Sequence, residues 1–190
     1  PVLPGAEVRI AEDGEICLKG PNVFAGYYKD DDNTAATLID GWLHSGDLGA
    51  FDADGYLNIT GRKKDIIITA GGKNITPKNI ESSLKNIDVV GEAVLIGDRR
   101  KFISALLSID PDALDKWCAD NGVPVDGALE NSQLRSHLQA GVDKTNEKFA
   151  RVEHVRKFTV LKRPLSIEEG ELTPTLKVKR NAVNESFASE

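Results

Sequence analysis

Several common features are scarce or missing in this sequence of 190 residues, and each shortage excludes a class of protein. The only two cysteines, Cys17 and Cys118, lie far apart and have neither metal-binding nor C-x-x-C spacing. They predict no zinc site and no disulfide framework, so a reducing compartment is expected. The sequence also has no methionine and begins at Pro1. We therefore expect a part cut from a longer protein.

Long apolar runs and an excess of basic residues are missing as well. No run approaches the ~20 apolar residues needed to span a bilayer, and the first residues do not resemble a signal peptide. The net charge of -6 argues against a dedicated nucleic-acid-binding protein, which would usually be basic. We expect a cytoplasmic protein with no transmembrane segment and no nucleic-acid partner. Peripheral association with a membrane stays open.

The composition that is present, 40% hydrophobic and 28% charged, is typical of a globular protein. The pattern along the chain changes near residue 64. Residues 1–63 are rich in strand and turn signals, whereas residues 64–190 mix strand and helix periodicity and are long enough to hold a core. We predict an α+β fold, in which the β-rich end of a large domain precedes a small C-terminal domain with a short sheet and flanking helices.

In residues 1–63, alternating apolar and polar residues with glycine-containing turns predict two hairpins and a short helix. The expected elements are a hairpin over residues 6–19, a helix over 33–39 capped by Asp32 or Asn33, and a hairpin around 51–57 with an Asp54-Gly55 turn. Further turns are expected at the polar residues 45–47 and at the basic residues 62–64.

In residues 64–190, short apolar runs predict strands, and apolar residues at helical spacing predict amphipathic helices. Strands are expected over residues 66–68, 92–96, 102–109 and 158–161. Helices are expected after the cap Thr76 with Pro77 at the first position, from Asp110-Pro111 to about Gly122, from Ser132 to about Phe149, and from Lys177 onward. An acidic loop, residues 168–174, precedes the last helix.

Asp47 is the first candidate binding residue. It lies in the segment Ser45-Gly46-Asp47-Leu48-Gly49, whose glycines permit a tight turn and the close approach of a ligand. An ionised carboxylate accepts two hydrogen bonds, which matches the two hydroxyls of a ribose. An aspartate that merely caps its own turn would look the same. These five residues alone leave both interpretations open.

Three further candidates each have an alternative interpretation. Arg62 offers a planar fork of donors for phosphate or ribose oxygens, or it belongs to a solvated basic turn. The Gly71-Gly72 pair suits a simple turn or the passage of a substrate chain. Lys177, approached through a segment stiffened by proline and threonine, suits contact with an oxyanion or phosphate, or it begins a solvated basic helix. The three histidines lack ligand spacing and are interpreted as structural or surface residues.

The order and spacing of these segments resemble the adenylate-forming superfamily, and in particular its long-chain fatty acyl-CoA synthetases. Four motifs carry the resemblance, which covers nearly the whole chain. They are Gly14-Glu15 through Gly20 with Gly26-Tyr27-Tyr28, the segment DGWLHSGD at residues 40–47, the hinge-like run from Gly61 through Asp65 and Gly71 to Glu81, and the terminal LTPTLK at residues 172–177.

The resemblance implies a role for each candidate. Asp47 would bind the ribose hydroxyls of ATP and of the acyl-adenylate, and Arg62 would contact the same nucleotide. Lys64 would be the hinge about which the small domain rotates, and Gly71 would line the path of coenzyme A. Lys177 would be the catalytic lysine of adenylation.

Two departures from the family pattern bear on these assignments. Many relatives have glycine where this chain has Leu176, so Lys179 is an alternative to Lys177 for the catalytic lysine. The spacing from Lys177 to Arg180 matches the family and favours Lys177. The phosphate-binding loop, the glutamate associated with Mg²⁺ and the fatty-acid pocket have no counterpart in this chain and would belong to a preceding domain.

The resemblance therefore implies part of a ligase that uses ATP and Mg²⁺ to convert a fatty acid to acyl-AMP and then transfers the acyl group to coenzyme A. The isolated chain is expected to be inactive without the missing N-terminal domain. Two alternatives stay open, namely a fatty acyl-AMP ligase that loads a carrier protein and a non-catalytic binding module.

Overall fold

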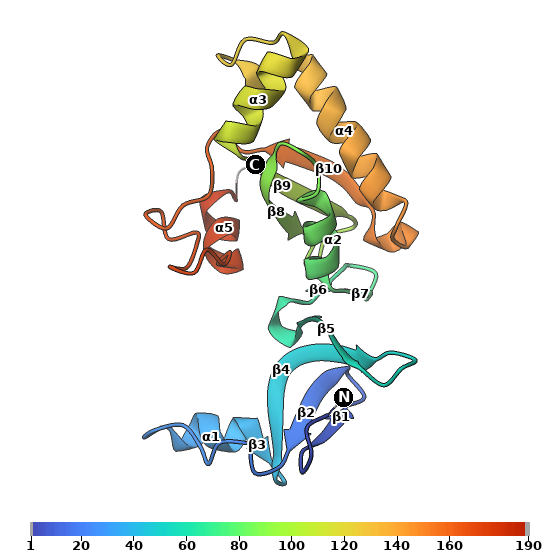
Figure 1. Ribbon diagram of the computed structural model, residues 1–190, viewed down its shortest axis with the longest axis vertical. Helices are drawn as coiled ribbons and strands as arrows, with labels where there is room; N and C mark the ends of the chain where they lie inside the picture. Colours follow the sequence, from blue (N-terminus) through green and yellow to red (C-terminus); the bar gives the residue numbers. More distant parts are fainter. Residues whose placement is uncertain (1, 189–190) are drawn as a thin grey trace. The chain divides into compact units, whose positions relative to one another are not determined.

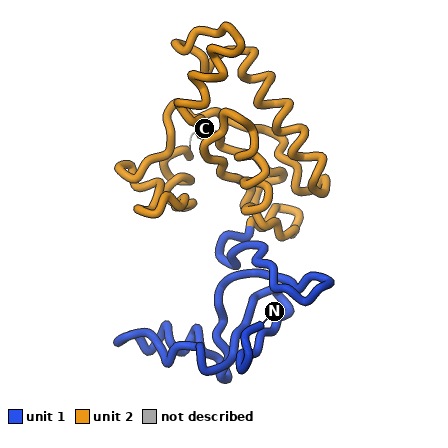
Figure 2. The backbone as a smooth tube through the Cα atoms, in the orientation of Figure 1, with its two compact units in different colours: residues 1–66 blue, residues 67–190 orange. Residues whose placement is uncertain are grey.

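The structure is a computed structural model that describes residues 2–188, and it divides into two compact units, residues 1–66 and 67–190 (Figure 2). The boundary expected from the sequence, between residues 63 and 64, lies just before this division. Each unit is built on a β-sheet of its own.

The first unit is an antiparallel sheet with one short helix (Figure 1). The strand order is β1-β2-β4-β3, and β5 pairs with β4. The elements are β1 (Glu7–Ile10), β2 (Glu15–Lys19), α1 (Asp31–Thr37), β3 (Leu38–Ile39), β4 (Trp42–Phe51), β5 (Leu57–Arg62) and the 3-10 turn η1 (Lys63–Asp65). Both predicted hairpins are confirmed, because β1 pairs with β2 and β4 pairs with β5, in each case antiparallel.

Two predictions for this unit are wrong in detail. The helix begins earlier than expected because the Asp30 carboxylate accepts the Asn33 amide N–H at 3.1 Å and caps it. It also ends earlier, since residues 38–39 pair with β4 as β3. The predicted turn at residues 45–47 lies inside β4 instead. Gly46 has a φ of +71°, which glycine adopts without strain, and the pairing with β2 shifts register between His44 and Leu48, as at a β-bulge.

The second unit is built on a three-stranded sheet of order β10-β9-β8, in which β8 and β9 are antiparallel and β9 and β10 parallel. Its strands are β6 (Ile67–Ile68), β7 (Asn74–Ile75), β8 (Val90–Ile96), β9 (Ile103–Ile109) and β10 (Val155–Val160). Its helices are α2 (Pro77–Leu84), α3 (Pro111–Asn121), α4 (Ser132–Asn146) and α5 (Arg180–Ser186), with 3-10 turns η2 (Ala128–Glu130) and η3 (Arg151–Glu153).

Both faces of this sheet are buried, because successive side chains of a strand point to opposite sides. One face packs against α2, α3 and α4 in a core that includes Leu107 of β9 (Figure 1). The other face, which includes Leu106, packs against α5 and the segment before it, through Leu161, Leu165, Leu172 and Val183. The strands therefore read as nearly continuous apolar runs.

Most elements predicted for residues 64–190 are confirmed, with shifted ends. Thr76 is the N-cap of α2, although its side chain makes no capping hydrogen bond, and Gly122 ends α3 in the left-handed conformation. Three predictions need correction. The strand at residues 66–68 is buried only at Ile67, α4 ends at Asn146 rather than Phe149, and the last helix begins at Arg180 rather than Lys177.

Among the described residues, no helix combines the length and the apolar character that crossing a membrane requires.

Candidate functional site

Two of the candidates predicted from the sequence meet in the first unit. Asp47 on β4 and Arg62 on β5 are directly opposite in register. The Arg62 Nε donates to Asp47 Oδ1 at 2.8 Å, and both side chains are partly exposed. Within residues 2–188 no other acceptor engages the guanidinium, so its terminal nitrogens have no partner in that part of the chain. The pair presents an acceptor and several donors side by side.

A hollow of about 330 Å³ lies next to this pair and is lined by Gly46, Arg62, Lys63 and Lys64. Three of its four lining residues carry a positive charge. Such a lining favours an anionic ligand, and arginine in particular suits a planar or forked arrangement of oxygens.

A buried carboxylate that was not predicted from the sequence, that of Glu15, contacts the chain neighbours of both residues of the pair. Glu15 on β2 is 4% exposed. Its Oε1 accepts the Gly46 amide N–H at 2.9 Å, and its Oε2 accepts the Lys63 ammonium at 3.0 Å and lies 2.9 Å from His44 Nδ1. Gly46 precedes Asp47 and Lys63 follows Arg62, so Glu15 fixes the chain next to both candidate residues. The sequence analysis named Glu15 only as part of the Gly14-Glu15 motif and gave it no role of its own.

The protonation of this network follows from its contacts. Burial alone would raise the pKa of Glu15, but hydrogen bonds from His44, Lys63 and Gly46 outweigh it and hold the pKa below the ordinary value. The Lys63 pKa is raised, first by its hydrogen bond to Asp13 and then by Glu15. An ionised carboxylate and an ammonium group are therefore the stable forms near neutral pH.

Part of this network, among the described residues, consists of residue types that bind metals. Ligand atoms of Glu15, Cys17 and His44 lie within 4.8 Å of one another, and these residue types bind zinc. However, both oxygens of Glu15 already contact Gly46, Lys63 or His44. The cluster is therefore satisfied as a hydrogen-bonded network without a metal.

Lys177 lies in the second unit, on an exposed turn before α5. The Thr173 N–H donates to the Lys177 carbonyl at 2.8 Å, and the Lys177 N–H donates to Thr173 Oγ1 at 3.0 Å. Leu176 has a φ of +58°, a conformation that costs a leucine energy and suits glycine. Both ends of the turn are thus held by hydrogen bonds, while the lysine side chain is exposed.

Next to this turn lies a second buried carboxylate, that of Glu171, which is fully buried. The predicted acidic loop therefore contains a core residue. Glu171 accepts two hydrogen bonds from the Arg163 guanidinium, at 2.7 and 2.8 Å, and a third from the Ser166 N–H at 3.1 Å. The Arg163 contact holds the Glu171 pKa below its ordinary value.

The last two candidates lie on short connecting segments. Lys64 is exposed in η1, and Gly71 is exposed between β6 and β7. A Cβ on Gly71 would meet only the Thr69 hydroxyl, at 3.9 Å, which is an ordinary contact. The fold itself does not require glycine at this position, so such a requirement would have to come from a ligand.

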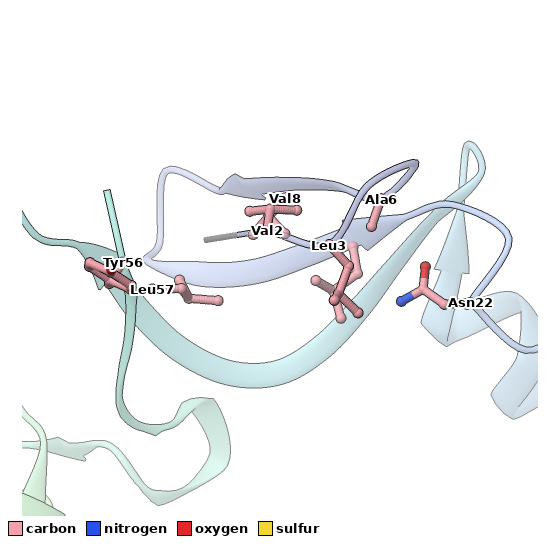
Figure 3. A pocket seen from close by; sticks show the side chains of 8 residues that line it. Val2, Leu3, Ala6, Val8, Asn22, Tyr56 and Leu57 are labelled. Atoms are coloured by element: carbon pink, nitrogen blue, oxygen red, sulfur yellow. The ribbon is translucent and has the colours of Figure 1, made fainter. Parts of the chain in front are cut away.

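A second hollow, of about 270 Å³, lies in the first unit beside β1 and the start of β5 (Figure 3). Its lining is mostly apolar, and Asn22 and Tyr56 supply the polar groups. It contains none of the candidates predicted from the sequence. The apolar hollow and the cationic hollow at Arg62 are therefore separate features.

Comparison with known proteins relates the chain to a described family. Residues 64–190 match the family described as AMP-binding enzyme C-terminal domain. A long-chain-fatty-acid–CoA ligase of Mycobacterium tuberculosis is 43% identical over 192 residues, covering 99% of this chain and 32% of the relative. Another from Bos taurus is 38% identical, covering 98% and 29%. The chain thus spans about a third of the length of these curated relatives.

Solved structures agree in fold. An adenylation domain of a carboxylate reductase from Mycobacterium chelonae superposes with a TM-score of 0.76 at 21% identity, covering 96% of this chain and 29% of that one. The o-succinylbenzoate CoA synthetase of Bacillus subtilis, solved with its acyl-adenylate intermediate, has a TM-score of 0.70 at 29% identity, covering 95% and 34%.

Proposed function

This chain belongs to the AMP-binding enzyme C-terminal domain family, and we propose that it works within a longer ligase that activates a fatty acid with ATP. The ligase first forms acyl-AMP and pyrophosphate, and it then transfers the acyl group to the thiol of coenzyme A with release of AMP. Support comes from fatty-acid–CoA ligases at 38–43% identity across nearly the whole chain. A cytoplasmic location, free or at a membrane surface, is part of this proposal.

The observation that carries the proposal is the Asp47–Arg62 pair beside a cationic hollow. In this role the Asp47 carboxylate accepts hydrogen bonds from the ribose hydroxyls of the adenylate. The free nitrogens of Arg62 contact oxygens of the same nucleotide. Glu15 keeps both residues in place through Gly46 and Lys63.

The second unit supplies the remaining groups in this proposal. Lys177 approaches the carboxylate and the α-phosphate and stabilises the charge that develops as the acyl-phosphate bond forms. Rotation about Lys64 exchanges the Lys177 turn for the Gly71 segment between the two half-reactions. Gly71, where the fold leaves open space, then lines the path of the coenzyme A chain.

Mg²⁺ would accompany ATP and neutralise charge on its phosphates. We assign it no ligand in this chain, because Asp47 is paired with Arg62 and Glu15 is enclosed by donors. The residues that bind the metal, the triphosphate and the fatty-acid chain are proposed to belong to the rest of the ligase.

The test is substitution of Lys177 by alanine in the complete ligase. We expect the rate of acyl-adenylate formation, measured as pyrophosphate release, to fall about 10²-fold or more, because a charged transition-state contact is lost. The matched control is Lys179→Ala, which removes the neighbouring alternative and should leave the rate nearly unchanged. If Lys177→Ala stays within a fewfold of the unsubstituted enzyme, or if Lys179→Ala is the slower variant, the assignment is wrong.

Two further measurements test whether the chain needs a preceding domain and which molecule accepts the acyl group. The isolated chain should form no acyl-CoA, and product formation by it would contradict the need for a preceding domain. With the complete ligase, coenzyme A should accept the acyl group and a carrier protein should not. The reverse result would make the protein a fatty acyl-AMP ligase.

A further inference from the structure

A second ion pair in residues 67–190 joins elements that are far apart in the sequence. The Arg180 Nη2 donates to Glu81 Oε1 at 2.7 Å, and the Arg180 Nη1 donates to the Leu95 carbonyl at 2.8 Å. Glu81 Oε1 also accepts the Leu95 N–H at 2.7 Å. The three residues thus form a closed ring of charge-assisted hydrogen bonds that connects α2, β8 and α5.

The ring forms at the free edge of the sheet. Among the strands of the described residues, β8 pairs with β9 alone and is an edge strand, so some of its backbone groups point away from the ladder. The N–H and carbonyl of Leu95 are satisfied by Glu81 and Arg180 instead of by another strand. Both charged side chains are largely buried, with 15% and 21% of their surface exposed. Loss of either partner therefore leaves polar groups of the others unsatisfied.

The position of the ring links it to the proposed catalytic lysine. Arg180 is the third residue after Lys177, and the intervening Lys179 N–H donates to the Glu171 carbonyl at 2.7 Å. The turn is therefore held from one side by the Arg163–Glu171 pair and from the other by Arg180. Glu81 belongs to α2, the helix that follows the segment with Lys64 and Gly71.

We propose that Glu81 and Arg180 are positioning residues for Lys177, and that they fix its turn to α2 so that the lysine moves with the hinge segment. This inference rests on the proposed function and adds two residues to it. Because the Lys177 side chain is exposed on a short turn, its reach is determined by the backbone on either side. A shift of about 1 Å at that backbone is enough to slow a reaction up to 10²-fold.

The predicted signature is a split between the two half-reactions. In the complete ligase, Glu81→Gln removes the charge at nearly the same shape and weakens the hold on Arg180. We expect acyl-adenylate formation from fatty acid and ATP to slow about 10-fold or more. Transfer to coenzyme A from supplied acyl-adenylate should stay at the unsubstituted rate, because Lys177 takes no part in that step. A merely structural role would slow both.

Two controls keep the experiment decisive. Lys85→Ala breaks the ion pair that joins the C-terminal end of α2 to Glu92 of β8 and does not involve α5, so it should leave both rates unchanged. The charge exchange Glu81→Arg with Arg180→Glu should not recover the adenylation rate, because it turns a donor toward the Leu95 N–H and an acceptor toward the Leu95 carbonyl. If Glu81→Gln is poorly folded, Arg180→Lys is used instead, because it keeps the positive charge but loses the forked donors of the guanidinium. It should slow acyl-adenylate formation by a smaller factor and leave the transfer to coenzyme A unchanged.

The outcomes separate the inference from its premise. Equal slowing of both half-reactions by Glu81→Gln and Arg180→Lys, or no slowing of adenylation, overturns the positioning role. An unsubstituted ligase that forms no acyl-adenylate overturns the proposed function itself.

Discussion

Both units hold their polar sites through hydrogen bonds to buried carboxylates, but the apolar core behind those bonds differs greatly between them. Among the described residues of the first unit, the buried apolar side chains are Ile16, Cys17 and Leu48. Its site residues lie within strands, and a buried glutamate fixes them through hydrogen bonds. The second unit has an apolar core on both faces of its sheet, and Lys177 lies on a turn outside that core. Polar contacts therefore give both sites their geometry, and only in the second unit does an apolar core on both faces of the sheet lie behind them.

The largest expected effect tests the difference in core. Leu107→Ala, at a fully buried position of β9, should lower the free energy of unfolding of residues 67–190 by about 3 kcal/mol. Leu48→Ala, at a buried position of β4, should affect only residues 1–66 and by less.

Each unit contains one tryptophan, Trp42 in the first and Trp117 in the second. Each leucine substitution is therefore made in two single-tryptophan proteins. In the Trp117→Phe protein the fluorescence of Trp42 follows urea denaturation of the first unit, and in the Trp42→Phe protein the fluorescence of Trp117 follows that of the second. Coincident shifts of both probes in either leucine variant would mean that the units unfold together and that the comparison fails.

A smaller effect is expected from the polar network of the first unit. Glu15→Gln keeps the shape of the side chain but weakens its bonds to Lys63 and His44, and it should cost about 2 kcal/mol in residues 1–66. AMP binding by the complete ligase should weaken, since Asp47 and Arg62 lose their support. Calorimetric titration with AMP measures this. The control Asp13→Asn removes the exposed partner of Lys63 and should have little effect.

Acid should loosen the first unit before the second. The carboxyls with a lowered pKa in residues 1–66 are Asp13, Glu15, Asp30 and Asp52, whereas Glu171 is the one such group described in residues 67–190. A carboxyl with a lowered folded pKa stabilises the fold fully above its ordinary value, here 3.8 or 4.5. That contribution is lost as the pH falls through the folded pKa, because the unfolded chain takes up protons first.

Acid titration of the two single-tryptophan variants tests this order. The Trp42 signal should change at a higher pH than the Trp117 signal. In the second unit, Glu171→Gln should flatten the pH dependence below 4.5. A Trp117 transition that precedes the Trp42 transition would contradict the proposed role of the polar network.

The smallest effect concerns the lysine turn. Leu176 is 65% exposed and has a φ of +58°, so Leu176→Gly should relieve strain and stabilise the second unit by up to about 1 kcal/mol. The matched control Leu176→Ala keeps the unfavourable φ and should give no stabilisation. Thermal unfolding followed by Trp117 measures both, and an equal rise in Tm for the two variants would mean that the backbone is not strained.

Much of this architecture could be predicted from local signals. The Asp54-Gly55 turn, Pro111 after Asp110 and the cap at Gly122 each act within a few residues, so the hairpin around 51–57 and the ends of α3 were predicted correctly. Predictions failed where a distant partner decides. Residues 45–47 look like a turn, yet His44 and Leu48 pair with β2 and Asp47 pairs with β5, so these residues form an irregularity within a strand.

The buried carboxylates were missed for the same reason. Glu15 and Glu171 have the sequence signature of surface residues, because glutamate is rarely buried unless it is paired. Their partners, Lys63 and Arg163, are 48 and 8 residues away. Glu81 and Arg180 are 99 residues apart, and no local pattern connects them.

The sequence by itself determined the order of the elements, the family and the identity of the candidate residues, because motifs and periodicity are local properties of the chain. Only the tertiary structure decided that Asp47 lies beside Arg62, that Glu15 supports both, and that Arg180 ties the lysine turn to α2. Those facts depend on strand register and on the pairing of buried charges. Both arise when segments far apart in sequence must satisfy each other's hydrogen bonds away from water.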